Sequence, residues 1–355
     1  MGKSILKYMI LLGLAGAGVS AMAATITEFY YVPQIPSFSN IRINNPYNPA
    51  DPNNPNFYQN TFQANGTPQL MANNIVVTSQ NYQFLPLSPT VWSGSQWTGL
   101  EPADRTNNSQ QAVGVVGSSP NYGSTVFQKD GYKVGMHLNT FAQSASAPNL
   151  PTKYSAASLQ YAIGFSPGPQ VWLSDDLLCM SGQANIATSY SAGSVNQVVF
   201  TMRFTDPATV NKFFLNVTMY DSRPGFPIRD IVIVDQQDTG RPIVISFTQS
   251  QSNPNPNVIY TSSIPGYGNP LTPALVGSFL SGNRDYGYCM SKAQFLRALN
   301  DINVLNAARM KPLLSTDPTR YRLDLALIGP EIETTNGRGH VGMSVNQLYV
   351  YRLRP

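Results

Sequence analysis

An alternation of apolar and polar residues with a period of two constrains the fold of this 355-residue chain more than any other feature. Val198, Phe200, Met202 and Phe204 occupy every second place in one such run. Successive side chains of a strand point to opposite faces, so this period predicts strands with one buried face. The same period, or a short β-branched run, recurs at 75–78, 213–220, 231–234, 243–247, 321–328 and 341–353. Since no strand–helix alternation is present, the sequence predicts an all-β, antiparallel β-sandwich.

One segment departs from this pattern and has helical spacing. Its apolar residues recur at intervals of three and four: Phe295, Leu296, Leu299, Ile302 and Leu305. Ser291 precedes the segment and Gln294 follows three residues later, which is the sequence of a capping box. We therefore predict a single amphipathic helix near residues 291–308, ending before Pro312.

The first 23 residues have the three parts of a secretory signal peptide. Lys3 and Lys7 precede an apolar run from about residue 8 to 19, and Ala21-Met22-Ala23 supplies the small residues of a cleavage site. A membrane anchor is the alternative, but it needs about 20 unbroken apolar residues. This run is shorter and rich in glycine. We expect cleavage near Ala23 and a mature protein without a membrane span, in the periplasm, at the cell surface or in the medium.

Residues 24–69 are dense in proline and asparagine. Each proline removes a backbone donor and favours extended geometry in the residue before it. Several aromatic residues in the same stretch argue against simple disorder. We predict an N-terminal arm that lies on the main domain or on a neighbouring copy, which allows self-association. Residues 70–355 are then expected to form one β-sandwich domain.

Charge is sparse, at 11% of residues against about 25% in an ordinary globular domain. The leader removes Lys3 and Lys7, so the 22 lysines and arginines fall to 20 against 18 acids, a net charge of +2. This near-neutral balance argues against nucleic acid as a partner. The surface depends instead on neutral hydrogen-bonding side chains, as in many extracellular β-proteins.

The chain has two cysteines, Cys179 and Cys289. In an oxidising compartment an isolated pair favours one disulfide. Two free buried thiols, or one reactive cysteine, are the alternatives. A nucleophilic cysteine needs a partner base, and neither of the two histidines is near in sequence.

Glu331 and Glu333 are the strongest catalytic candidates. On a strand they point to the same side, about 7 Å apart, and paired carboxylates can act on a glycosidic bond. Alternatively, they flank a hairpin and are merely solvated. Pro330, directly before them, favours a strand edge or a bulge.

With its late helix followed by two long strands and this E-x-E pair, the chain resembles the concanavalin A-like jelly rolls of lectins, glucanases and some polysaccharide lyases. The resemblance covers roughly residues 150–355 and implies a jelly-roll fold with a glycan ligand. Glucanases of this kind carry E-x-D-x-E, whereas Glu331-Ile332-Glu333 lacks the third acid. The alginate-lyase form needs a Gln-x-His strand, which this sequence does not contain. The resemblance therefore supports the fold and weakens the enzyme hypothesis.

Metal and cofactor signals are absent from the sequence. His137 and His340 have no Cys, Asp or Glu at ligand spacing, and no zinc motif or phosphate loop occurs. Asp175 and Asp176 are a weak calcium candidate, because neighbours on a strand point to opposite faces. We expect no metal and no cofactor.

Aromatic rings that can stack on sugars are the best ligand-binding candidates. Trp92 and Trp97 lie in a stretch of small residues that predicts a loop, and Tyr286 and Tyr288 lie beside Cys289. Tyr220 is expected on the polar face of its strand with Asn216 and Thr218, and Arg322 and Asp324 on the polar face of theirs. An ordinary solvated sheet face has the same composition.

Three functions remain open from the sequence. The first is a secreted, non-catalytic carbohydrate-binding protein. The second is a secreted polysaccharide-cleaving enzyme, a glycoside hydrolase or lyase that uses Glu331 or Glu333. The third is a structural or adhesive subunit of the cell surface whose arm docks on a neighbouring chain.

Overall fold

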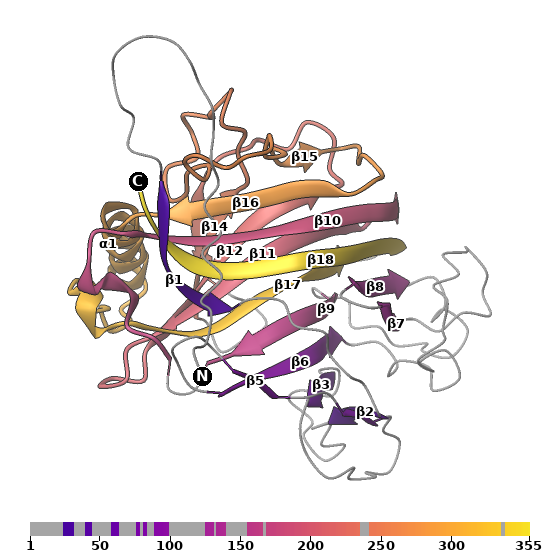
Figure 1. Cartoon of the computed structure of the whole chain (residues 1–355), viewed down its shortest axis with the longest axis horizontal. Coiled ribbons are helices and arrows are strands. Elements are labelled where there is room, and N and C mark those ends of the chain that lie inside the picture. Colours follow the sequence, from indigo (N-terminus) through magenta and orange to yellow (C-terminus); the bar gives the residue numbers. More distant parts are fainter. Residues whose placement is uncertain are drawn as a thin grey trace, which may run out of the picture.

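The computed structural model describes residues 24–31, 40–44, 58–63, 76–78, 81–83, 89–98, 125–130, 133–139, 155–165, 168–234, 241–334 and 338–355. The predicted leader lies outside these residues, so its cleavage stays a prediction. Two β-sheets and one helix account for the architecture, which confirms the all-β sandwich and the single helix. Figure 1 shows one sheet in front of the other, with the helix α1 (Lys292–Ala308) at one end.

The smaller sheet has six strands in the order β16–β10–β18–β8–β7, and β1 pairs with β18. All of these pairings are antiparallel. The bounds are Thr25–Tyr31 for β1, Thr125–Asp130 for β7, Lys133–Asn139 for β8, Leu177–Ala192 for β10, Arg284–Met290 for β16 and Arg338–Arg354 for β18.

The larger sheet has twelve strands in the order β13–β14–β12–β11–β17–β9–β6–β3–β2–β4, and β15 pairs with β12 and β5 with β6. The β12–β14 and β12–β15 pairs are parallel. In this sheet the bounds are Asn40–Asn44 for β2, Tyr58–Gln63 for β3, Val76–Thr78 for β4, Asn81–Gln83 for β5, Pro89–Thr98 for β6 and Ser155–Gly164 for β9. The remaining bounds are Val195–Thr205 for β11, Lys212–Asp221 for β12, Ile231–Val234 for β13, Pro242–Phe247 for β14, Leu275–Val276 for β15 and Arg322–Thr334 for β17.

The core lies between the two sheets, where the predicted alternation places it. Val198, Phe200, Met202 and Phe204 of β11 are all fully buried there. They pack with inward residues of the small sheet such as Met180, in one continuous apolar cluster. We call the side of each sheet that faces this core its inner face and the opposite side its outer face.

β-Bulges shift the phase of the alternation in β10, β12, β17 and β18, and no local sequence pattern marks them. In β12 the register shifts beside Val198 and Val199, so that Tyr220 points inward with the core instead of outward with Asn216. In β18 the shift opposite Ser181 turns Tyr349 away from the core, although Val345 faces it. One extra residue on one strand reverses the facing of every residue beyond it.

The helix α1 begins and ends where its sequence predicts. Ser291 accepts a hydrogen bond from the backbone N–H of Gln294, and the Gln294 side chain accepts one from the backbone N–H of Ser291. The apolar face of the helix packs Phe295 against Trp172, Phe204 and Phe213, with ring centroids 4.8–5.5 Å apart. Among the described residues, no helix is long and apolar enough to cross a bilayer.

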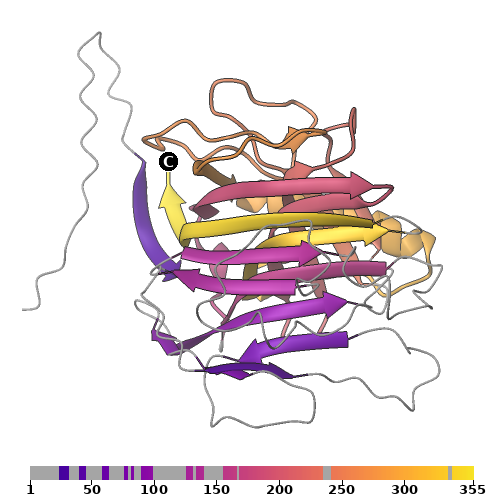
Figure 2. The ribbon, with the colours of Figure 1, turned by 90° about the vertical axis from the view of Figure 1, so that its right-hand side faces the viewer.

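Part of the predicted arm is built into the sheets. The strand β1 pairs with the end of β18, at the C-terminal end of the molecule (Figure 2). The ion pair Arg352–Glu28 measures 3.0 Å, and Tyr30 is buried in the core. The boundary near residue 70 between arm and domain stays a prediction, and so does self-association through the arm.

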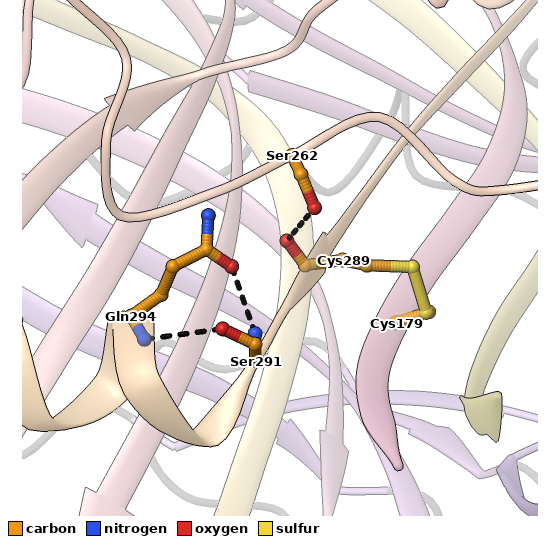
Figure 3. The surroundings of a disulfide bond; sticks show 5 residues. All are labelled: Cys179, Ser262, Cys289, Ser291 and Gln294. Atoms are coloured by element: carbon orange, nitrogen blue, oxygen red, sulfur yellow. Dashed lines mark hydrogen bonds between the residues drawn. A yellow bond between two sulfur atoms is a disulfide. The ribbon is translucent and has the colours of Figure 1, made fainter. Parts of the chain in front are cut away.

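The predicted disulfide is confirmed. Cys179 and Cys289 are register partners on β10 and β16, and their sulfurs are bonded (Figure 3). The backbone of Ser262 exchanges two 2.8 Å hydrogen bonds with that of Cys289. The disulfide therefore lies where the long segment after β14 crosses the outer face of the small sheet.

Candidate functional site

The outer face of the large sheet carries most of the predicted polar site residues that the structure places at a surface. All four of them lie on β17, which pairs with β11, and β11 pairs with β12: Arg322, Asp324, Glu331 and Glu333. Asp221 and Glu331 are both register partners of Gln197, one on each side. Residues that are direct partners on adjacent strands point to the same face, so these three form one row across the sheet.

A buried carboxylate organises one end of this row. The side chain of Asp221 is fully buried and accepts two hydrogen bonds from the Arg223 guanidinium, at 2.9 and 2.6 Å. It also accepts one from the Gln197 amide at 2.7 Å. The Arg223 guanidinium in turn lies 3.6 Å from the centre of the Phe226 ring. Asp221 thus serves as a fixed anion that orients Gln197 and is not itself accessible to a ligand.

The two predicted acids lie at the other end of the row. Glu331 is half-buried and Glu333 is exposed, and both point outward because Ile332 between them is in the core. Their separation along the strand is about 7 Å. The structure thus brings them together with Gln197, which the sequence did not single out, while their catalytic role stays a prediction.

A second polar group lies further along the same strands. Asp324 accepts hydrogen bonds from Arg203 at 2.8 Å and from the Thr205 hydroxyl at 2.6 Å. Thr201 donates a 2.8 Å hydrogen bond to the side-chain oxygen of Asn216 on the neighbouring strand. These contacts fix the side chains on a rigid sheet, which suits a binding surface.

Arg322 lies at the far end of the face and donates a 3.0 Å hydrogen bond to the carbonyl of Gly168. Both Arg322 and Asp324 therefore lie on the outer face, as predicted from the alternation. Their ligand-binding role stays a prediction. The alternation of β11 predicts that Arg203 faces outward. Its ion pair with Asp324 joins two strands, so the sequence of β11 alone does not predict that contact.

Three tyrosines predicted to bind a ligand lie in the core. Tyr220, Tyr286 and Tyr288 are 2%, 0% and 0% exposed. The bulge in β12 turns Tyr220 inward, where its hydroxyl donates to Ser189 of the opposite sheet at 2.9 Å. Tyr286 and Tyr288 alternate with Cys289, which faces outward, so they face inward. A buried ring cannot stack on a sugar, and we place none of the three in the candidate site.

The predicted loop around Trp92 and Trp97 is wrong, because both residues belong to β6. Trp92 is the register partner of Ile163, and Trp97 is the register partner of Ser158, which in turn pairs with Glu331. Trp97 therefore occupies the same register row as Gln197 and Glu331. The side chains of both tryptophans lie outside the described residues.

The described residues contain no group of three or more His, Cys, Asp or Glu arranged to hold a metal ion. Asp176, part of the weak calcium candidate, accepts hydrogen bonds from Arg354 at 3.0 Å and Arg352 at 3.2 Å. Thr27 donates a third hydrogen bond to it. Its charge therefore helps to hold β1 against β18.

No family model matches the chain, and no curated protein matches it. Several solved structures are similar in fold. A family 12 xyloglucanase from Bacillus licheniformis is 10% identical with a TM-score of 0.33, covering 89% of this chain and 100% of that one. The family 11 xylanase from Neocallimastix patriciarum is 10% identical with a TM-score of 0.29, covering 74% and 91%. The likeness concerns the fold and assigns no residue or activity here.

Proposed function

We propose that this protein is exported and binds a polysaccharide across the outer face of β12, β11 and β17. The observation that carries the proposal is the row of Asp221, Gln197 and Glu331, with the second group around Asp324 on the same face. These side chains are held by hydrogen bonds before any ligand arrives. A surface organised in advance spends little of its binding free energy on ordering side chains.

The chemistry of this face suits sugars. Amide, carboxylate and guanidinium groups offer several donors and acceptors in one plane, which match the hydroxyl groups of a sugar ring. The middle of the face is buried, at Val199, Thr201, Thr218 and Leu327, so a ligand reaches the face through the groups at its two ends. The disulfide and the predicted leader agree with an extracellular location, where such a ligand is available.

Replacing Gln197 by Ala is expected to weaken polysaccharide binding about tenfold. The change removes one oriented amide. A hydrogen bond contributes about 0.5–1.5 kcal/mol, and a loss of about 1.4 kcal/mol of binding free energy raises the Kd tenfold. The ligand is first identified on a glycan array, and its Kd is then measured by titration calorimetry. Asn300→Ala is the matched control, because Asn300 is an exposed amide on α1. Equal Kd values for the two variants would refute this face as the site, and a mature protein that binds no glycan would refute the function.

Glycoside hydrolysis is a second candidate, favoured by the different surroundings of Glu331 and Glu333. One is half-buried and the other is exposed, as expected for an acid and a base with separate tasks. Their Cα atoms are about 7 Å apart on the same side of β17, which lets both carboxyl groups reach one ligand.

If the protein is a hydrolase, Glu331→Gln should lower the rate of reducing-sugar release at least a hundredfold, because a general acid contributes about 10²–10⁴-fold. The measurement uses the polysaccharide that the array identifies. Asp175→Asn serves as the control, since that side chain is 97% exposed and lies beside Lys292 at the start of α1, not on β17. Binding by the unchanged protein with no release of reducing sugar would exclude hydrolysis and leave the binding function intact.

A further inference from the structure

Two positively charged side chains lie at one end of the candidate face. Lys212 on β12 and Arg322 on β17 are both register partners of Thr205 on β11. Phe213 and Leu323, their neighbours in sequence, face the core, so Lys212 and Arg322 face outward. Their backbones are two strand spacings apart, about 10 Å, which lets both side chains reach a group placed above Thr205.

These two charges are not compensated by the acids that the structure describes. Neither Lys212 nor Arg322 makes an ion pair within the described part of the chain. Of the two acids near Thr205, Asp206 is paired with Arg320, and the two oxygens of Asp324 are occupied by Arg203 and Thr205. Three cations, Arg203, Lys212 and Arg322, therefore meet one anion, Asp324, which leaves this end with a charge of +2.

The opposite end of the face carries the acids Glu331, Glu333 and Asp221. Asp221 is balanced by Arg223, and the two glutamates have contacts of their own. The two ends are eight residues apart along β11, or about 26 Å. A ligand with negative groups is attracted to the end with Lys212 and Arg322, so these two charges set where the negative group binds.

We propose that Lys212 and Arg322 bind a negatively charged group of an acidic polysaccharide, a carboxylate or a sulfate, above Thr205. The inference rests on the proposed function and adds the class of ligand to it. A guanidinium presents paired N–H groups that match the oxygens of a carboxylate or sulfate, and the lysine adds a second charge. The hydrogen bond from Arg322 to the carbonyl of Gly168 uses one donor of five and fixes the direction of the guanidinium.

The test compares binding of the mature protein to polygalacturonate, to a sulfated galactan and to neutral xylan, by affinity electrophoresis and calorimetry. The double variant K212Q/R322Q is expected to bind the acidic polymer at least tenfold more weakly and neutral xylan within twofold of the unchanged protein. Binding of the acidic polymer by the unchanged protein should also weaken as salt is raised, because the charges are at the surface. The control K311Q/R229Q removes two exposed cations from elsewhere.

The outcomes separate this inference from the function on which it rests. A preference for polygalacturonate identifies a carboxylate, and a preference for the galactan identifies a sulfate, and either supports the inference. Equal loss of binding in both double variants shows a general charge effect and overturns it. Binding of xylan with no preference for an acidic polymer overturns the inference and leaves the function standing, whereas no binding of any polysaccharide overturns both. The melting temperature of each variant identifies any loss that comes from unfolding.

Discussion

Breaking the Cys179–Cys289 disulfide is expected to lower the free energy of unfolding by about 5 kcal/mol, the largest effect of any change considered. The two cysteines are 110 residues apart in sequence, and a loop of that length restricts the unfolded chain strongly. The bond also holds the outer face of the small sheet, where Ile264, Leu271 and Tyr351 pack around it. The expected shift in melting temperature is on the order of 10 °C downward.

The measurement is thermal unfolding of the mature protein with and without a reductant, beside the double variant C179A/C289A. The variant should melt at about the temperature of the reduced protein, and the reductant should not change it further. Because both cysteines are fully buried, the variant also leaves small cavities, and the reduced unchanged protein controls for them. A reductant that fully reduces the bond and lowers the melting temperature by less than 2 °C would contradict the expectation.

Features that depend on neighbouring residues were predicted well from the sequence. The capping box of Ser291 and Gln294 involves groups three residues apart, and it forms as predicted. The core face of β11 follows from alternation alone. The disulfide follows from the presence of two cysteines in a chain that is predicted to be exported. Each of these predictions needs only local geometry or a count.

The candidate site was predicted only in part, because it depends on how strands meet. Tyr220 is turned inward by a bulge that no local pattern marks, so it leaves the polar face. Gln197 belongs to the candidate site because Asp221 and Glu331 are its register partners on two different strands. Trp97 comes into the same row through β9, although small residues around it favoured a loop. Register between strands is a property of the whole sheet, and the sequence of one strand does not contain it.

Asp230 is expected to make the protein lose stability as the pH rises from about 4 to about 6, by roughly 3 kcal/mol. One of its oxygens accepts backbone hydrogen bonds from Ile259 at 2.7 Å and Tyr260 at 2.6 Å, while the other is buried without a partner. Burial raises the pKa of this carboxyl from 3.8 to about 6, against the opposing effect of those hydrogen bonds and of Arg297. A shift of about two units corresponds to roughly 3 kcal/mol.

The sign follows from proton binding. Between pH 4 and pH 6 the folded protein holds a proton on Asp230 that the unfolded chain has released, so folding is favoured by low pH. This stabilisation is complete below the unfolded pKa and is lost as the pH rises through the folded one. Asp230 is also connected to α1 through Tyr260, whose hydroxyl donates a 2.6 Å hydrogen bond to Asp301 of the helix.

Asp230→Asn isolates this contribution, because an amide oxygen can accept the same two backbone hydrogen bonds without a charge. Urea unfolding at pH 4.5 and pH 7 should show that the variant's gain in stability over the unchanged protein is about 2 kcal/mol larger at pH 7 than at pH 4.5. Comparing the two proteins at each pH cancels the titration of the other carboxyls, most of which favour folding at higher pH. Asp175→Asn, at an exposed site, should leave the difference between the two pH values unchanged. A variant that is less stable than the unchanged protein by the same amount at both pH values would show that Asp230 is charged in the folded protein and stabilises it in that form.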